Sequence, residues 1–218
     1  MAGLAMSRPA ECDNRWRVPA WSVLASSAMS LVCALVLMAG SWYWVRVWYR
    51  EVHYFAGFKL LRQGALPLAV KHLELSKAWG PREVNAIYEL GNAYARLERY
   101  PDADKMYFEA LQANAGYDEI YYNIGAIKSS RLKQTQEAIP YYRMAWWINP
   151  VSYDVYNSLS SLYLQAPDRY ADEALALLKR AVHFFPSNPN AWHNLGYLYA
   201  LRKNYGEAEK AYVQALTI

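Results

Sequence analysis

The distribution of apolar and charged positions divides the chain into two parts. From Trp21 to Val45 no residue carries a formal charge, and roughly 20 helical residues suffice to cross the hydrocarbon core of a membrane. Aromatic residues stand at both ends of this stretch, as they do at membrane interfaces. The pattern predicts a short tail over residues 1–18 and a transmembrane anchor helix over residues 19–49.

Two other interpretations of the apolar stretch stay open. Arg8, Arg15 and Arg17 precede it, as in a signal peptide, and residues 38–41 resemble a weak cleavage site. The apolar core of a signal peptide has about 7–15 residues, so this stretch is long for one. A lipoprotein would need Cys33 at its processed end, whereas Cys33 lies in the middle of the stretch. A retained anchor is therefore the favoured interpretation.

Small residues recur every fourth position in the apolar stretch, at Ser26, Ser30 and Ala34. They predict a stripe on which another membrane helix could pack, although a lone anchor would tolerate the same residues. Basic residues flank both ends of the stretch in nearly equal number, so the positive-inside rule leaves the orientation open. The short tail and the long C-terminal part favour a single-pass protein whose C-terminal part is extracytoplasmic, on the periplasmic face.

Beyond residue 49 the chain becomes repetitive. Small residues recur at Gly91, Gly125, Ser160 and Gly196, each followed further on by alanines that flank a tyrosine or leucine. A period near 34 residues is typical of solenoids built from helix–turn–helix units. The spacing predicts repeats over residues 50–83, 84–117, 118–152, 153–188 and 189–218.

Two of these stretches, AIYELGNAYARLERYPDADKMYFEAL and NAWHNLGYLYALRKNYGEAEKAYVQAL, resemble the consensus of the tetratricopeptide repeat (TPR). The resemblance covers about residues 50–218. It implies an all-α helix–turn–helix solenoid of about four or five stacked repeats, in which a small residue of helix A lets an alanine-bearing helix B approach. The third and fourth repeats carry extra residues, at 131–134 and 165–168, which we expect in loops between helices A and B.

In TPR proteins the first helix of each repeat lines a concave groove, so the resemblance also implies a binding surface. Its residues here are rich in rings and amides, which suit an extended peptide backbone, although the same tyrosines could pack inside the solenoid. One TPR subclass clamps carboxylates with cations, but Tyr88, Asp154 and Ser158 stand at those positions. The predicted partner-binding residues are Tyr54, Phe55, Phe58, Tyr88, Asn92, Arg96, Tyr122, Asn123, Asn157, His193, Asn194 and Tyr197.

The charge distribution narrows the choice of partners. Residues 1–83 hold ten Lys and Arg against five Asp and Glu, whereas residues 84–218 hold thirteen against fourteen. The positive excess therefore surrounds the anchor, where anionic lipid headgroups would attract it, and no basic stripe suits a nucleic acid. We expect protein partners, including membrane proteins, and a lipid bilayer, with no nucleic acid and no small-molecule substrate.

The sequence contains no pattern that predicts catalysis or metal binding. Cys12 and Cys33 both precede the repeats, the four histidines lack metal-ligand spacing, and no phosphate-binding glycine loop occurs. We expect no enzyme activity, no cofactor and no metal.

The predicted function is a membrane-anchored scaffold that assembles or stabilises a membrane-associated complex. One alternative is a permanent accessory subunit of a respiratory, photosynthetic, secretion or pilus assembly. Another, of a different class, is the TPR-bearing part of a membrane glycan ligase or polymerase; a single membrane span argues against it, because it leaves no membrane core for a catalytic site.

Overall fold

The computed structural model describes residues 20–218, with side chains from Ala25 onward, and the predicted tail at 1–18 lies outside this range. The chain divides into two compact units, Met1–Val47 and Trp48–Ile218. Helix α1 (Ala20–Arg62) supplies the described part of the first unit and the first residues of the second.

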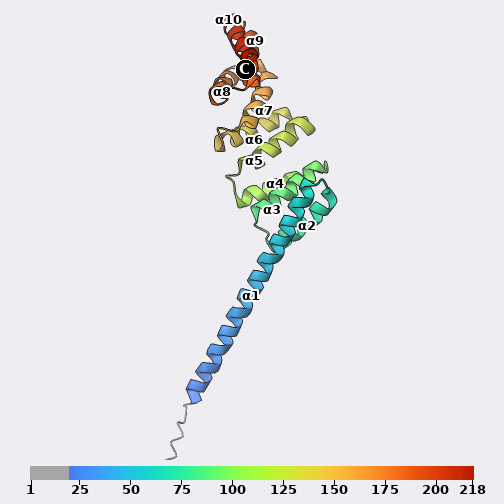
Figure 1. Ribbon diagram of the computed structural model, residues 1–218, viewed down its shortest axis with the longest axis vertical. Coiled ribbons are helices and arrows are strands. Elements are labelled where there is room, and N and C mark those ends of the chain that lie inside the picture. The colour runs from blue at the N-terminus through green and yellow to red at the C-terminus, as the bar shows by residue number, and fades with distance from the viewer. Residues whose placement is uncertain (1–19) are drawn as a thin grey trace, which may run out of the picture. The chain divides into compact units, whose positions relative to one another are not determined.

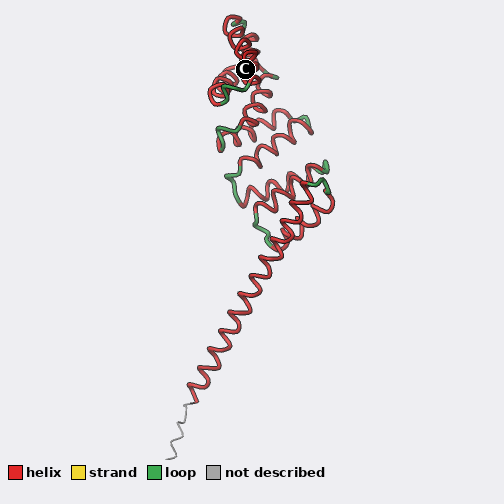
Figure 2. The backbone as a smooth tube through the Cα atoms, in the orientation of Figure 1, coloured by secondary structure: helices red, strands yellow, loops and turns green. Residues whose placement is uncertain are grey.

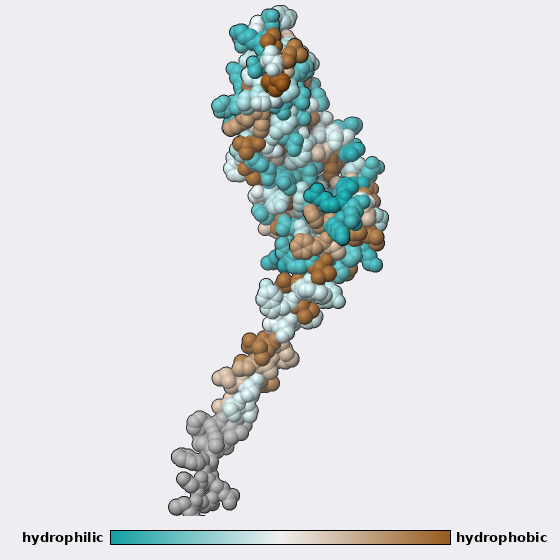
Figure 3. All heavy atoms as spheres, viewed as in Figure 1, coloured by the Kyte–Doolittle hydropathy of each residue, from teal (hydrophilic) through white to brown (hydrophobic). Residues whose placement is uncertain are grey.

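In the first unit, every described side chain from Ala25 to Arg46 is exposed. Bulky apolar residues are among them, with Leu37 71% exposed, and Figure 3 shows little of the hydrophilic colour on this part of the chain. The Ser30 hydroxyl donates to the Ser26 carbonyl at 2.9 Å, so the helix satisfies it internally. Among the described residues, only the helix spanning Ala25–Arg62 is long and apolar enough to cross a membrane.

The second unit is an all-α solenoid of successive helix pairs, as the sequence predicted (Figures 1 and 2). We call the first helix of each pair an A helix and the second a B helix. The A helices are the end of α1, α3 (Val84–Arg96), α5 (Asp118–Ala126), α7 (Tyr153–Leu164) and α9 (Pro189–Leu201). The B helices are α2 (Leu66–Trp79), α4 (Tyr100–Ala113), α6 (Thr135–Ile148), α8 (Pro167–Phe184) and α10 (Tyr205–Thr217).

The small residue of each A helix faces a large side chain of its B helix. A Cβ atom on Gly91 would lie 2.7 Å from Cε1 of Tyr107, closer than two carbon atoms can pack. The glycine thus makes room for a tyrosine ring, whereas the sequence interpretation had placed an alanine there. In the fourth pair Ser160 replaces the glycine, and Leu178 lies beside it on the wall of the same small cavity. The larger Ser160 on the A helix is thus matched by a side chain on the B helix, Leu178, that is smaller than tyrosine.

A residue in the left-handed region ends four of the A helices. The φ angles are 79° at Gly64, 59° at Glu98, 58° at Lys133 and 60° at Lys203. Each lies in the turn that leads into the B helix. Only Gly64 adopts this conformation without strain, because the other three carry a Cβ.

The extra residues of the third and fourth repeats lie partly in loops, as expected: residues 132–134 and 165–166 form turns, whereas Arg131, Pro167 and Asp168 are helical. After α5 the chain forms a π-helical turn, η1 (Ile127–Arg131), closed by a hydrogen bond from the Leu132 amide to the Ile127 carbonyl at 3.0 Å. A π-turn absorbs one residue without breaking the helix. In the fourth repeat, α8 begins one turn early at Pro167 and kinks at Tyr170, where φ is −122° and ψ is 19°.

Two hydrophobic clusters form the core of the solenoid. One extends from the end of α1 to η1 and includes the buried ring of Tyr107, and the other extends from α6 to α10 and includes the buried ring of Tyr156. Each cluster draws on several helix pairs, as expected where no repeat buries its own apolar face alone.

Candidate binding groove on the A-helix face

Two neighbouring cavities lie along the A helices, with volumes of about 520 and 750 Å³. The first is lined mainly by the end of α1, α3, α5 and η1, and the second by α5, η1, α7 and α9. They share Ala126 and Ser130, so they adjoin each other on one face of the solenoid. We call this face the A-face groove.

A hydrogen-bond network crosses the first cavity from one helix pair to the next. The Tyr107 hydroxyl donates to Oδ1 of Asn92 at 2.7 Å. The Asn123 amide donates to the same oxygen at 3.0 Å and to the Tyr88 hydroxyl at 3.2 Å. These amides and phenols therefore hold α3, α4 and α5 in register and present the remaining polar atoms to the groove.

The first cavity is charged. The guanidinium of Arg96 donates from Nη1 to the Leu61 carbonyl at 2.6 Å, and the same carbonyl at the end of α1 also accepts from the Gly64 amide at 3.2 Å. Arg96 thus lines the groove and also joins two repeats. The charged lining residues are Arg62, Arg96, Arg131, Glu89 and Glu119.

The second cavity contains no carboxylate, lysine or arginine among its lining residues. The Ser158 hydroxyl donates to the Tyr122 hydroxyl at 3.4 Å, and the hydroxyls of Ser129 and Tyr142 lie 3.1 Å apart. Asn157 is exposed. The cavity therefore offers amide, hydroxyl and imidazole groups to a neutral polar surface such as a peptide backbone.

The hydroxyls of Tyr88, Tyr107 and Tyr142 in the groove stay protonated over the physiological pH range. Burial raises the pKa of Tyr88 to about 12. It also raises the pKa values of Tyr107 and Tyr142 above the usual value for the phenol. Each hydroxyl can therefore donate as well as accept a hydrogen bond.

Most of the predicted partner-binding residues line one of the two cavities. Their role in binding stays a prediction, because the structure contains no partner. Tyr88, Asn92, Arg96 and Asn123 line the first cavity, and Tyr122, Asn157, His193, Asn194 and Tyr197 line the second.

The three aromatic residues predicted from the first repeat lie outside these two cavities. Tyr54 contacts the rings of Phe55 and Phe58, with centroids 5.3 and 6.1 Å apart. The Arg62 guanidinium covers the Phe58 ring at 5.0 Å, while Phe55 is 62% exposed. These rings form a separate aromatic cluster on α1.

Sequence reasoning missed groove residues that come from B helices, among them Tyr107 and Tyr142. Their rings pack against Gly91 and Gly125, and their hydroxyls reach the groove. The signal was present in the sequence, because an aromatic residue recurs at this position in three repeats. This recurrence indicates packing between helices, and the sequence alone did not show that the hydroxyls reach the groove.

Within the described part of the chain, no group of three or more His, Cys, Asp or Glu residues is placed to hold a metal ion. His53 and His72 do pair, with their Nδ1 atoms 3.0 Å apart. One imidazole must donate and the other accept at this distance, which joins the end of α1 to α2.

Comparison with known proteins agrees with this architecture. The tetratricopeptide repeat model matches residues 189–218. The photosystem I assembly protein Ycf3 of Cyanophora paradoxa is 29% identical over 136 residues, which are 56% of this chain and 77% of that protein.

Solved structures show the same fold. The crystal structure of MamA aligns with a TM-score of 0.68 at 21% identity, covering 78% of this chain and 91% of MamA. YrrB, described as a TPR protein with an unusual peptide-binding site, aligns with a TM-score of 0.63 at 23% identity, covering 76% of this chain and 84% of YrrB. The chain therefore has the fold of a tetratricopeptide-repeat solenoid, and its last helix pair carries a repeat that matches the sequence model of that family.

Proposed function

We propose that this protein is a membrane-anchored TPR scaffold that holds an extended segment of another protein in the A-face groove. By doing so it assembles or stabilises a membrane-associated complex. The observation that carries the proposal is the pair of adjoining cavities, lined by amides and phenols from successive A helices.

The chemistry of the groove suits a polypeptide backbone. An amide side chain both donates and accepts hydrogen bonds, so Asn157 and Asn194 can pair with the alternating N–H and C=O groups of an extended strand. The neutral second cavity would take backbone and uncharged side chains. The first cavity, with three arginines and two glutamates, would select charged side chains of the same segment.

The relatives support a role in assembly or peptide binding. Ycf3 is named for photosystem I assembly, and YrrB for its peptide-binding site. For this chain we propose the general property, a groove that binds a protein segment. The identity of the complex does not follow from the likeness.

The described part of α1 supports membrane anchoring. Its side chains from Ala25 to Arg46 are exposed and mostly apolar, and removing such surface from water contributes about 25 cal/mol per Å². A bilayer would cover it. We propose a single span with the solenoid on the extracytoplasmic side, and a small-residue stripe at Ser26, Ser30 and Ala34 that packs on a neighbouring membrane helix.

The test uses exposed groove residues, because Tyr88 and Asn123 also hold the fold together. Asn157→Ala combined with Tyr197→Ala removes two exposed side chains from the second cavity. The matched control, Gln214→Ala with Tyr205→Ala, removes the same kinds of side chain from exposed positions on α10.

Tagged chains would be purified from membranes in mild detergent, and the co-purifying proteins quantified by mass spectrometry. We expect the groove variant to lose its protein partner and the control to retain it. Equal retention by both variants would refute the groove assignment. A constant ratio of partner to chain would identify a permanent subunit, and a low ratio would identify a transient adaptor.

A further inference from the structure

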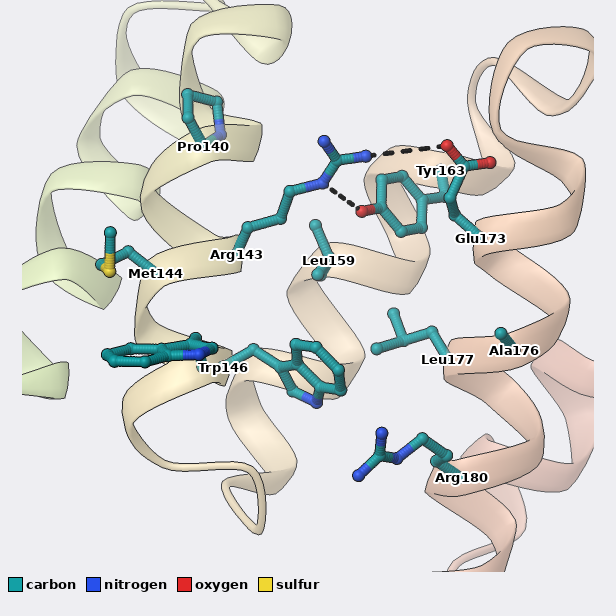
Figure 4. Close-up of a pocket in the computed structure, with 11 residues that line it drawn as sticks. Pro140, Arg143, Met144, Trp146, Leu159, Tyr163, Glu173, Ala176, Leu177 and Arg180 are labelled. Carbon is teal, nitrogen blue, oxygen red and sulfur yellow. Dashed lines mark hydrogen bonds and ion pairs between the residues drawn. The ribbon is translucent and has the colours of Figure 1, made fainter.

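A third cavity lies between the B helices α6 and α8, which flank a cleft of about 740 Å³ (Figure 4). Helix α7 contributes Leu159 and Tyr163 to its wall. None of the predicted partner-binding residues lines this cleft, so it is independent of the A-face groove. We call it the B-face cleft.

The wall of the cleft is mainly apolar and aromatic. Trp146, Leu159 and Leu177 line its interior, and Figure 4 shows the three side chains converging between the helices. At its edge, Trp147 is 75% exposed and Met144 is 41% exposed. Tryptophan and methionine are enriched in protein interfaces, and tryptophan is prominent among the residues that dominate binding energy.

The two ends of the cleft differ in charge. At one end Arg143 is already engaged, since its Nε donates to the Tyr163 hydroxyl at 2.7 Å and its Nη2 lies 3.8 Å from Glu173. At the other end the Arg180 guanidinium covers the Trp146 ring at 5.0 Å. Arg180 makes no ion pair with any residue between 20 and 218.

The same end also lacks a hydrogen-bond acceptor. The indole Nε1 of Trp146 is buried and has no partner within the described chain. A buried donor without an acceptor destabilises the site by about 1–3 kcal/mol. At this end of the cleft an exposed positive charge without an ion pair thus lies beside an apolar surface, and a carboxylate would pair with it.

The length of the cleft indicates the form of the occupant. Its lining residues run from Pro140 to Trp147 on α6 and from Glu173 to Arg180 on α8. At about 1.5 Å per residue each edge is roughly 10 Å long. Two turns of an amphipathic helix present their apolar side chains over the same length.

We propose that the B-face cleft binds a second protein segment, a short amphipathic helix whose apolar face enters the cleft and whose carboxylate pairs with Arg180. The scaffold then holds two segments at once, one in the A-face groove and one in the B-face cleft.

The test uses two synthetic helical peptides and the full chain in nanodiscs of zwitterionic lipid. Both peptides carry leucines at positions i, i+3, i+4 and i+7 and a fluorophore. One has a glutamate at the end of the apolar stripe, and the other has a lysine at that position. Binding is measured by fluorescence anisotropy for the wild type, Arg180→Glu and the matched control Lys179→Glu, which makes the same charge change on the next residue of α8.

We expect the glutamate peptide to bind saturably and the lysine peptide to bind more weakly. Arg180→Glu lowers the affinity for the glutamate peptide about tenfold and raises the affinity for the lysine peptide by a similar factor. Lys179→Glu leaves both affinities within about twofold, because at the surface a more distant charge is screened. Trp147→Ala lowers the affinity for both peptides by the same factor, since it removes only apolar contact.

Three results would overturn the proposal. The first is the absence of saturable binding by either peptide. The second is an equal response to Arg180→Glu and Lys179→Glu. The third is complete release of the glutamate peptide by vesicles of anionic lipid, which would make a lipid the occupant of the cleft.

Discussion

Replacing Gly91 by alanine tests how closely the A and B helices must approach. The added Cβ would lie 2.7 Å from Cε1 and 2.8 Å from Cδ1 of Tyr107. The ring is buried, with 1% of its surface exposed, so it cannot swing into solvent. Overpacking of this kind destabilises a core by about 1–3 kcal/mol.

The matched control is Gly206→Ala, because nothing lies within 4 Å of the Cβ position at Gly206. Both substitutions place alanine in a helix and so gain up to about 1 kcal/mol of helix propensity. The difference between the two variants therefore isolates the overpacking. We expect Gly91→Ala to be less stable than Gly206→Ala by about 1–3 kcal/mol.

The fourth repeat suggests how the stability could be restored. There Ser160 lies beside Leu178 instead of a tyrosine, so Tyr107→Leu should accommodate alanine at position 91. The Tyr107→Leu change itself is destabilising, because it removes a buried ring and its hydrogen bond to Asn92. The two changes should couple by about 1–3 kcal/mol in a double-mutant cycle.

Urea unfolding, followed by far-UV circular dichroism in one detergent, measures all four variants and the wild type. If Gly91→Ala proved as stable as Gly206→Ala, the ring would be able to move freely, and the argument from close approach would be wrong.

Three further predictions rest on single contacts. Glu98→Gly should raise the free energy of unfolding by up to about 1 kcal/mol, because φ is 59° at this residue. An unchanged free energy of unfolding in urea would contradict the strain at Glu98. Burial raises the pKa of Tyr94 to about 12 from 10, so the folded state holds this proton while the unfolded chain releases it, and stability should fall as pH rises from 10 to 12. Tyr94→Phe should lose less stability over that range in thermal melts, and an identical loss would contradict the assignment. Lys77→Met should lower stability by about 1 kcal/mol or less, because the ion pair with Glu109 at 2.6 Å is partly exposed. In thermal melts, high salt should reduce the difference in stability between this variant and the wild type, because salt screens the ion pair.

The helix pairs could be predicted from the sequence because their signal is local. A small residue at Gly91, Gly125 or Gly196 marks an A helix, and alanines such as Ala103 and Ala110 mark a B helix. These positions are fully constrained by the packing of neighbours within one repeat. The pattern alone is therefore enough to predict an all-α solenoid.

The π-turn η1 and the early start of α8 could not be predicted in the same way. One additional residue can lengthen a loop, or it can be absorbed by a hydrogen bond that spans one residue more, as between Leu132 and Ile127. The two outcomes have similar local composition. Contacts with the flanking helices decide between them, so the sequence near Arg131 gave no indication of the π-turn.

The TPR resemblance implied which A-helix residues face the groove, and their role in binding stays a prediction. The hydroxyl of Tyr107 and the bond from Arg96 to the Leu61 carbonyl were not foreseen, since each joins residues from different helices. The B-face cleft was missed for the same reason. Trp146 and Arg180 are far apart in the sequence, and only the packing of α6 beside α8 brings them together.

The most direct test of the central claim is photo-cross-linking from the groove in native membranes. A photoreactive amino acid would replace Tyr197, which is 43% exposed and lines the second cavity. In a parallel chain it would replace Tyr205, which is 69% exposed on α10. The account predicts that position 197 yields a discrete cross-link to a segment of another protein, and that position 205 does not give the same product. The absence of any protein cross-link from position 197, or the same products from both positions, would contradict it.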